Sequence, residues 1–548
     1  MMMAVLLLSL PNLLTAFYPR VDPTQAESFW LGIGLILLPA VFGLAVRPTL
    51  LLWLPLVALM PATMLYTLYT GSPLREWAFV VLMETDAKEL ARFWSAAVAA
   101  LVLAPLVVWL VWWFIHRHIG KGHRLGWLTR VVVIIFALVI PAANIKDSGW
   151  EFGTLATQRK LSATYPIGPV VAAAAAFQIR HNLEARGSIA QDIAVTPSAV
   201  KQREIYVLVI GESARAGSFQ LNGYERETTP LLAKTDGILS FKDVSAPATV
   251  TLMSVPLLLT PARAPWLGKA AGMPSVVSIF KQAGFHTAWL STQRKHGRYD
   301  TSCSIYANDA HESRFLSGSF APGVGTYESA FDGELVAPVC ELISHHDPKL
   351  LIVLHTMGSH QHYGERVPPG FNPFNSYPAR CEPDPMTGKY SAEQVRNLTN
   401  AYDNSIRYTD EVLSRLIGAL AATHAVSVLF YISDHGQNKG DAKVLPFAHG
   451  SMTRDVVQLP MILWLSPEYR VHYPDKAAAL SSHLATPFSA DTTFHTLTDM
   501  AGLDCPLLNR QRSVASAGFQ PGKRLLRNLD GVVVDYDEAL ARAAKKQP

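Results

Sequence analysis

The stretch IYVLVIGESARAGSFQLNGYERETTP, residues 205–230, decides how the fold is interpreted. Its first six residues form a continuous apolar run rich in β-branched side chains, a pattern typical of a strand buried on both faces of an α/β sheet. Glu212 follows directly after this run and Gly211. Ligands of open α/β sheets bind beyond the carboxyl ends of the strands, so Glu212 is a candidate site residue.

Two further apolar runs end in polar clusters of the same kind. The run 426–432 leads into SDHG, which contains Asp434 and His435, and the run 350–354 leads into HTMGSH. Carboxylates and imidazoles brought together from separate strand ends suit a divalent metal ion, zinc above all. The sequence therefore predicts a zinc site that includes Glu212, Asp434 and His435.

The chain of 548 residues is long enough for more than one domain, and its hydrophobic segments are unevenly distributed. We expect a transmembrane domain over residues 1–145, a connector with a bridging, interfacial helix over residues 146–200, and a catalytic domain over residues 201–548. In the connector, the alanine-rich segment 170–186 predicts a helix that ends near Gly187.

The first domain is expected to contain five membrane-spanning helices, each near the ~20 apolar residues that cross a bilayer. These segments are residues 2–18, 29–46, 49–70, 93–115 and 127–144. The start lacks a basic region and a small-residue cleavage site, so we expect the first segment to remain as an anchor. The loop HRHIGKGHR, residues 116–124, is basic and therefore predicted to be cytoplasmic, which places everything after residue 145 on the outer side.

The catalytic domain alternates predicted strands with helical stretches such as residues 393–421, which favours a mostly parallel sheet with helices on both faces. The predicted strands are residues 205–210, 286–291, 350–354, 426–432 and 459–465. The net charge of +4 is modest and basic runs are few, which argues against a nucleic-acid partner. Four cysteines allow three pairings among which the sequence does not choose. They are Cys303, Cys340, Cys381 and Cys505.

The ordered motifs GES, GYERETTP, TVTLMSVP (249–256), SDHG and AHG (448–450) resemble those of the phosphoethanolamine transferases of Gram-negative envelopes. This family belongs to the alkaline phosphatase/sulfatase superfamily and includes the mobilised colistin-resistance enzymes. The resemblance implies a multi-pass protein of the bacterial inner membrane with its catalytic domain in the periplasm, expected to be monomeric, and a link to polymyxin resistance.

The resemblance further implies transfer of phosphoethanolamine from phosphatidylethanolamine to a lipopolysaccharide acceptor, lipid A or the inner core, with release of diacylglycerol. It implies one firmly bound zinc ion and leaves a second, weaker one open. Two alternatives remain, namely the same transfer to another envelope glycan and hydrolysis by a sulfatase or phosphodiesterase. The C/S-x-P-x-R motif of sulfatases has no counterpart near the expected nucleophile.

The resemblance assigns Thr251 as the nucleophile and as a metal ligand. Thr251 opens an apolar helical run, so backbone N–H groups and the positive end of the helix dipole would face an incoming phosphate. A threonine hydroxyl is a poor nucleophile near neutral pH, and zinc coordination would lower its pKa. Thr249 is the chemically identical alternative, with helix capping or phosphate binding as its other roles.

Two histidines, His360 and His449, match further family positions and are expected to hold donor phosphate oxygens or the second zinc ion. The alternative is that both are ordinary surface histidines without a role in the site. The sequence also departs from the colistin-resistance enzymes. Gln437 stands where they have Glu, and Pro247 and Leu257 stand where they have a cysteine pair. Acceptor identity therefore does not transfer from those relatives.

The remaining substrate-binding candidates are polar residues beside expected loops. Gln293 and Lys295 follow a predicted strand where relatives place polar groups against the donor. Glu84 and Glu89 follow the apolar AFVVLM in an outer loop, and they could meet the ammonium head of a phospholipid. The alternative for these two glutamates is that they are solvated acids on an interfacial helix.

Overall fold

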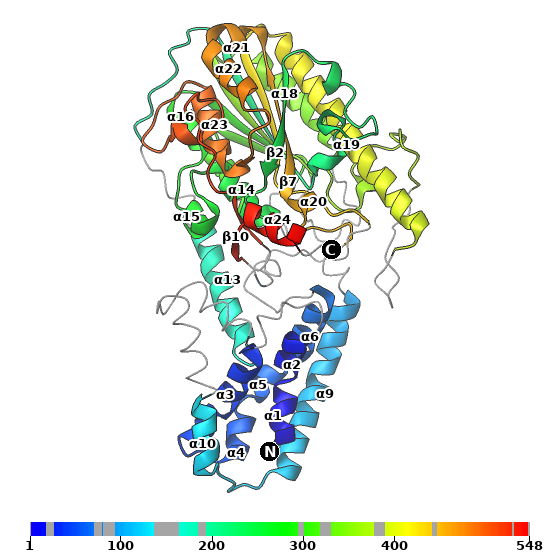
Figure 1. Ribbon diagram of the computed structural model, residues 1–548, viewed down its shortest axis with the longest axis vertical. Helices are drawn as coiled ribbons and strands as arrows, with labels where there is room; N and C mark the ends of the chain where they lie inside the picture. Colours follow the sequence, from blue (N-terminus) through cyan, green and yellow to red (C-terminus); the bar gives the residue numbers. More distant parts are fainter. Residues whose placement is uncertain are drawn as a thin grey trace. The chain divides into compact units, whose positions relative to one another are not determined.

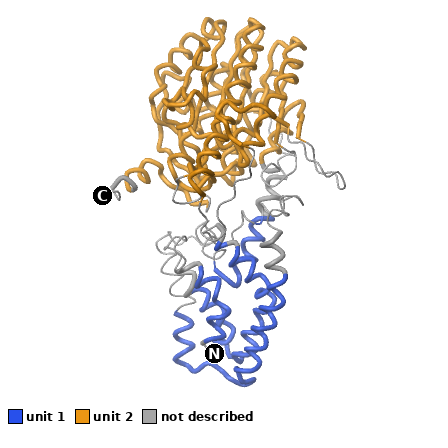
Figure 2. The backbone as a smooth tube through the Cα atoms, turned by 90° about the vertical axis from the view of Figure 1, so that its right-hand side faces the viewer, with its two compact units in different colours: residues 1–181 blue, residues 182–548 orange. Residues whose placement is uncertain are grey.

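The computed structural model describes residues 2–17, 27–70, 79, 94–135, 164–184, 193–293, 301–317, 330–377, 390–440, 446–528 and 531–545. The chain divides into two compact units, Met1–His181 (unit 1) and Asn182–Pro548 (unit 2), which Figure 2 shows in different colours. The predicted connector, residues 146–200, contributes to both units.

The regular secondary structure described in unit 1 is all helical. Its helices are α1 (Met2–Leu8), α2 (Leu10–Phe17), α3 (Glu27–Val41), α4 (Val46–Leu51), α5 (Leu54–Val57), α6 (Met60–Thr70), α9 (Trp94–His118), α10 (Trp127–Ile134) and α13 (Gly168–Glu184), which continues three residues past His181. Asn12 of α2 links this helix to the segment that contains Tyr165. Its side-chain amide donates to Tyr165 O (2.7 Å) and accepts from Tyr165 N (2.8 Å). Within the ranges given above, no helix combines the length and hydropathy required of a membrane span.

Unit 2 is built around an eight-stranded sheet whose order is β4-β3-β5-β1-β6-β7-β2-β8. The strands are β1 (Glu204–Gly211), β2 (Ile238–Ser245), β3 (His286–Ser291), β4 (Glu312–Phe315), β5 (Lys349–His355), β6 (Val426–Ser433), β7 (Gln458–Leu465) and β8 (Phe488–Ser489). From β4 to β6 neighbouring strands are parallel, whereas β7 runs antiparallel to both β6 and β2. The sheet is therefore mixed, and the five predicted strands are all present.

Both faces of the sheet are covered by helices (Figure 1). Alternate residues of β1 belong to two hydrophobic clusters, with Tyr206 and Leu208 in one and Val207 and Val209 in the other. The first cluster also takes apolar residues of α14 (Thr251–Leu259), α16 (Val276–Gln282) and α23 (Thr493–Met500), and the second takes those of α18 (Val336–Ser344) and α19 (Ala392–Ala421). Every residue of β1 is buried, which explains its continuous apolar sequence.

Helix α19 matches the predicted helical stretch and starts at a capping box. Ser391 N donates to Gln394 Oε1 (2.8 Å), and Gln394 N donates to Ser391 Oγ (3.2 Å). Three of the four cysteines, Cys303, Cys340 and Cys505, lie in the described part of the chain, where no disulfide joins any two of them. Cys381 lies outside the described residues.

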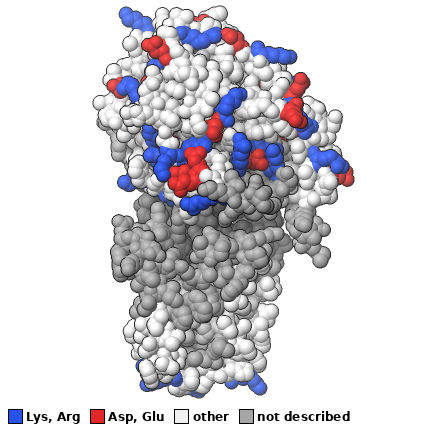
Figure 3. Space-filling view, viewed as in Figure 1, with Lys and Arg blue, Asp and Glu red and all other residues white. Residues whose placement is uncertain are grey.

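The C-terminal segment of unit 2 returns to the region of Thr249. A small antiparallel sheet joins β9 (Leu525–Arg527) to β10 (Val533–Asp535), and α24 (Tyr536–Lys545) follows. Arg527 accepts a hydrogen bond from Thr249 N through its carbonyl (3.0 Å). Charged residues of both signs are interspersed over the face of unit 2 in Figure 3, and Arg524 pairs with Asp243 (2.6 Å).

Candidate metal centre

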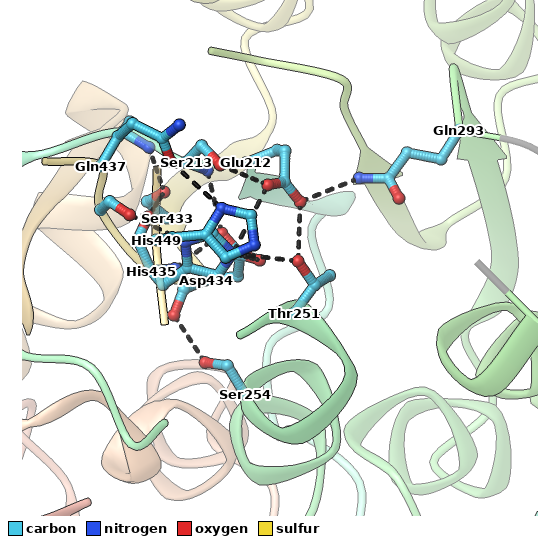
Figure 4. Close-up of polar contacts among 12 residues, drawn as sticks. Glu212, Ser213, Thr251, Ser254, Gln293, Ser433, Asp434, His435, Gln437 and His449 are labelled. Atoms are coloured by element: carbon cyan, nitrogen blue, oxygen red, sulfur yellow. Dashed lines mark hydrogen bonds and ion pairs between the residues drawn. The ribbon is translucent and has the colours of Figure 1, made fainter. Parts of the chain in front are cut away.

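Three central strands deliver polar residues to one edge of the sheet. The parallel register places Gly211 at the end of β1 opposite Ser433 of β6, and Ile210 opposite His355 of β5. The residues that follow these strands therefore meet, although they lie far apart in the sequence. Figure 4 shows Glu212 and Asp434 among the side chains gathered at this edge.

Glu212, Asp434 and His435 form a compact, buried cluster. One potential ligand atom from each lies within 4.8 Å of the others. His435 Nε2 is 3.3 Å from Asp434 Oδ2 and 3.6 Å from Glu212 Oε1. The structure thus brings together the three residues that the sequence selected as metal ligands.

Thr251 brings a fourth oxygen to this cluster. It is the first residue of α14, and its Oγ1 lies 3.0 Å from Glu212 Oε2 and 3.1 Å from His435 Nε2. The helix is fastened beside the cluster by Ser254, whose hydroxyl donates to Asp434 O (2.6 Å). The hydroxyl of Thr251 is therefore held at the start of a helix and in contact with two candidate ligands.

The hydrogen bonds of His435 and Asp434 leave one lone-pair-bearing atom of each side chain available to a cation. His435 Nδ1 lies 2.9 Å from Gly436 O, and because a carbonyl only accepts, this nitrogen carries the proton and Nε2 keeps its lone pair. Asp434 Oδ2 is buried and has no hydrogen-bond partner among the described residues. A buried carboxylate oxygen without a donor is costly, and a bound cation removes that cost. Two carboxylates, an imidazole nitrogen and a hydroxyl fit zinc.

The electrostatics of the metal-free cluster also favour a bound cation. Burial, together with the neighbouring charge of Asp434, raises the pKa of Glu212 to about 8. Burial raises the pKa of Asp434 to about 6 and lowers the pKa of His435. In the described part of the chain, neither carboxylate forms an ion pair with Lys or Arg. The site therefore lacks the positive charge that two buried carboxylates need.

His449 lies against the cluster and is oriented by Gln437. The rings of His435 and His449 have centroids 4.3 Å apart. The Gln437 amide nitrogen donates to Phe447 O (2.9 Å), so its Oε1, 3.2 Å from His449 Nδ1, accepts from that nitrogen. The Thr249 hydroxyl donates to Gly450 O (3.1 Å) and thus fastens the loop that carries His449.

Gln293 and His360 approach the cluster from two other loops. Gln293 Nε2 donates to Thr356 O (2.8 Å) and lies 3.4 Å from Glu212 Oε2. The His360 loop is tied to the cluster because Ser359 N donates to Glu212 O (2.9 Å). Burial lowers the pKa of His360 to about 3, and the charge of His435 contributes.

Three predicted substrate-binding residues, Lys295, Glu84 and Glu89, lie outside the described residues. Two residues near the site were not selected from the sequence. Ser213 contacts both carboxylates, and its position next to Glu212 was the only available signal. Asp332 accepts from Gly358 N (2.9 Å) and so holds the His360 loop, a contact to backbone that leaves no sequence signature.

The comparison with protein-family models matches residues 204–503 to the sulfatase family. The chain belongs to the sulfatase family. Within this family its curated relatives include phosphoethanolamine transferase EptC of Escherichia coli (strain K12), 26% identical over 503 residues, which cover 87% of this chain and 84% of that protein. Phosphoethanolamine transferase CptA of Salmonella typhimurium is 26% identical over 94% of this chain and 90% of that protein. The predicted relationship to phosphoethanolamine transferases is confirmed.

Two solved structures of phosphoethanolamine transferases are similar to this chain in fold. The C-terminal periplasmic domain of EptC from Escherichia coli, in complex with Zn, matches with a TM-score of 0.55 and 26% identity, covering 63% of this chain and 96% of that domain. The integral membrane protein lipooligosaccharide phosphoethanolamine transferase A from Neisseria meningitidis matches with a TM-score of 0.64 and 22% identity. That match covers 93% of this chain and 97% of the other, so the likeness of fold extends over both units.

Proposed function

We propose that this protein is a zinc-dependent phosphoethanolamine transferase with Thr251 as its nucleophile. The observation that carries the proposal is the position of Thr251 Oγ1, at hydrogen-bond distance from both Glu212 Oε2 and His435 Nε2. The names of the relatives, and the zinc complex of the EptC domain, support the reaction and the metal. Glu212, Asp434, His435 and Thr251 would hold one zinc ion.

In the proposed reaction the Thr251 oxygen attacks the phosphorus of phosphatidylethanolamine. The bond from phosphorus to the diacylglycerol oxygen breaks, diacylglycerol leaves, and phosphoethanolamine remains on Thr251. Glu212 Oε2 and His435 Nε2 are the two atoms placed to accept the proton of the Thr251 hydroxyl. A bound zinc ion would lower the pKa of that hydroxyl and neutralise phosphoryl oxygens.

In the second step an acceptor hydroxyl or phosphate oxygen attacks the same phosphorus, and Thr251 leaves as its hydroxyl. The acceptor we propose is a lipopolysaccharide component, lipid A or the inner core. His449 and His360 are proposed to hold phosphate oxygens or a second zinc ion, since the ring of His449 lies against that of His435, and the backbone N–H of Ser359, next to His360, donates to Glu212 O. Gln293 is proposed to contact the donor, and Thr249 to position the His449 loop.

We propose that unit 1 anchors the enzyme in the inner membrane through the five predicted spans, with unit 2 in the periplasm. Large apolar side chains exposed on α9, among them Val102 (64% exposed) and Trp109 (54% exposed), support a lipid environment. An anchor holds the active site near lipid donors and so raises their effective concentration. A reporter that works only in the periplasm should be active when fused after Pro548, and activity of a cytoplasmic reporter there would contradict this topology.

The reaction is tested by following a labelled headgroup. The full-length chain in detergent is incubated with phosphatidylethanolamine labelled in its ethanolamine, with and without purified lipopolysaccharide. We expect diacylglycerol release and transfer of the label to the glycolipid, and loss of both after zinc removal. Release of the label only as free phosphoethanolamine, with lipopolysaccharide present, would assign a hydrolase instead. Label on a different envelope glycan, but not on lipopolysaccharide, would correct the acceptor.

A further inference from the structure

Ser213 stands between the two carboxylates of the metal cluster in an unusual backbone conformation. Its φ is +57°, a left-handed value that non-glycine residues rarely adopt, and its side chain is fully buried. The surroundings hold it there. The Tyr402 hydroxyl donates to Ser213 O (2.8 Å) and accepts from Arg215 N (2.9 Å). Tyr402 is itself fully buried on α19.

This conformation directs two donors of Ser213 at two different carboxylates. Its hydroxyl donates to Glu212 Oε1 (2.6 Å), and its backbone N–H donates to Asp434 Oδ1 (3.1 Å). The other oxygen of each carboxylate receives no hydrogen bond from Ser213 and lies near another member of the cluster, and Glu212 Oε1 itself remains 3.6 Å from His435 Nε2. Glu212 Oε2 lies 3.0 Å from Thr251 Oγ1, and Asp434 Oδ2 lies 3.3 Å from His435 Nε2 (Figure 4).

We propose that Ser213 is a positioning residue that turns Oε2 of Glu212 and Oδ2 of Asp434 toward the metal ion. The inference rests on the proposed zinc-dependent function. Hydrogen bonds to ligating side chains fix their orientation, and their loss typically weakens metal binding 10–100-fold. Asp434 Oδ1 also accepts from His435 N (2.6 Å), whereas Glu212 Oε1 has the Ser213 hydroxyl as its one hydrogen-bond donor in the described residues. Loss of the hydroxyl therefore acts chiefly on Glu212.

The test measures zinc affinity of the full-length chain by competition with a chelator. Ser213→Ala removes the hydroxyl, and we expect zinc affinity to fall about 10–100-fold. Ser213→Gly also removes the hydroxyl but relieves the left-handed strain, so its zinc affinity should fall as far although the metal-free fold is at least as stable as wild type. If Ser213 had a purely structural role, Ser213→Gly would instead lower the stability of the metal-free fold and leave zinc affinity close to that of the wild type. The visible absorption of Co²⁺ bound in place of zinc should change in both variants.

The matched control is Ser466→Ala at the opposite edge of the sheet. Ser466 is a buried serine whose hydroxyl donates to Ala425 O (3.1 Å) and accepts from Tyr469 N (3.0 Å). Its loss should leave zinc affinity unchanged. Wild-type affinity in both Ser213 variants, or an equal fall in Ser466→Ala, would overturn the inference alone. A wild-type chain that binds no zinc would overturn the proposed function and the inference with it.

Discussion

The central strand β1 carries a buried glutamate at each end, and the two have opposite environments. Glu204, at the start of the strand, lies 3.2 Å from Lys349 Nζ and accepts hydrogen bonds from the hydroxyls of Tyr206 and Tyr473. Glu212, just past the end, lies beside a second carboxylate, and its donors among the described residues are uncharged.

The difference separates a structural carboxylate from a functional one. Both side chains are at most 2% exposed, so burial alone does not distinguish them. A buried charge is stable in a protein when an opposite charge accompanies it. Glu204 has that charge in Lys349, whereas no Lys or Arg in the described part of the chain pairs with Glu212 or Asp434, and the proposed cation would supply it. The four predictions below test this contrast.

The largest expected effect is at Thr251, the proposed nucleophile, which lies beside Glu212 and has no counterpart beside Glu204 among the described residues. Thr251→Ala should lower transfer by on the order of 10³-fold or more, since the covalent route is lost. Without an acceptor, the wild type should accumulate phosphoethanolamine on Thr251, detected by intact mass and peptide mapping. Thr251→Ser should keep a fraction of both adduct and turnover.

Thr249→Ala is the matched control for this experiment, because Thr249 is chemically identical and bonds to Gly450. Its adduct should still form on Thr251, only more slowly. An adduct on Thr249 would reverse the assignment, and turnover at the wild-type rate in Thr251→Ala would exclude the covalent mechanism.

Replacing each glutamate by glutamine should have opposite effects on metal and stability. Glu212→Gln should abolish zinc binding while keeping the metal-free fold at least as stable, because it removes a carboxylate from beside Asp434. Glu204→Gln should keep full zinc content but lower the free energy of unfolding by about 2 kcal/mol, because it leaves Lys349 without its partner. Elemental analysis and urea unfolding measure the two effects. Zinc retained in Glu212→Gln would contradict the proposal that Glu212, unlike Glu204, binds the metal ion.

The pH dependence of the metal-free protein should also come from the Glu212 end. The pKa of Glu212 is raised from 4.5 to about 8 on folding, so the folded state binds more protons than the unfolded state between these values. The contribution of Glu212 to stability therefore falls as pH rises through this window. The raised pKa of Asp434 acts in the same direction up to about 6, whereas the lowered pKa of buried histidines such as His360 acts in the opposite direction below about 6.5. Thermal unfolding from pH 4.5 to 8.5 with a chelator measures this slope. The stability of the wild type relative to Glu212→Gln should fall as pH rises from 4.5 to 8, and a difference that does not change with pH would assign the effect elsewhere.

The smallest effect is expected at an uncharged neighbour of Glu212. Gln293→Ala removes a donor 3.4 Å from Glu212 Oε2 and a hydrogen bond to Thr356 O. We expect the transfer rate to fall about tenfold, as for loss of one hydrogen bond to a charged group, with zinc content unchanged. A loss of zinc in Gln293→Ala would show that the amide, and not the carboxylates alone, maintains the cluster.

The sequence predicted the buried strands because their burial is complete. β1 and β6 are buried at every position and read as continuous apolar runs. β2 carries Lys242 and Asp243, and the edge strand β4 contains Glu312 and Arg314, so neither shows such a run. The antiparallel direction of β7 was not predictable either, since an apolar run gives no information on strand direction.

The site was predictable to the extent that its residues follow strand ends. Glu212, Asp434 and His435 each come directly after a central strand, and the structure brings them together with Thr251. The contacts of Ser213 depend on a left-handed backbone angle, and those of Asp332 on backbone donors. Neither kind of interaction leaves a pattern of residue types in the sequence.

The position of β1 between β5 and β6 has a consequence for biosynthesis. The sequence distance from Ser213 to Asp434 is 221 residues, so β6 leaves the ribosome long after β1. During that interval β1 presents an unpaired edge, of the kind that favours aggregation. Metal loading at the proposed site is consequently a late event, because a chain that stops before residue 426 lacks strand β6 and the two proposed ligands Asp434 and His435. Bound zinc would thus mark chains whose synthesis has passed His435.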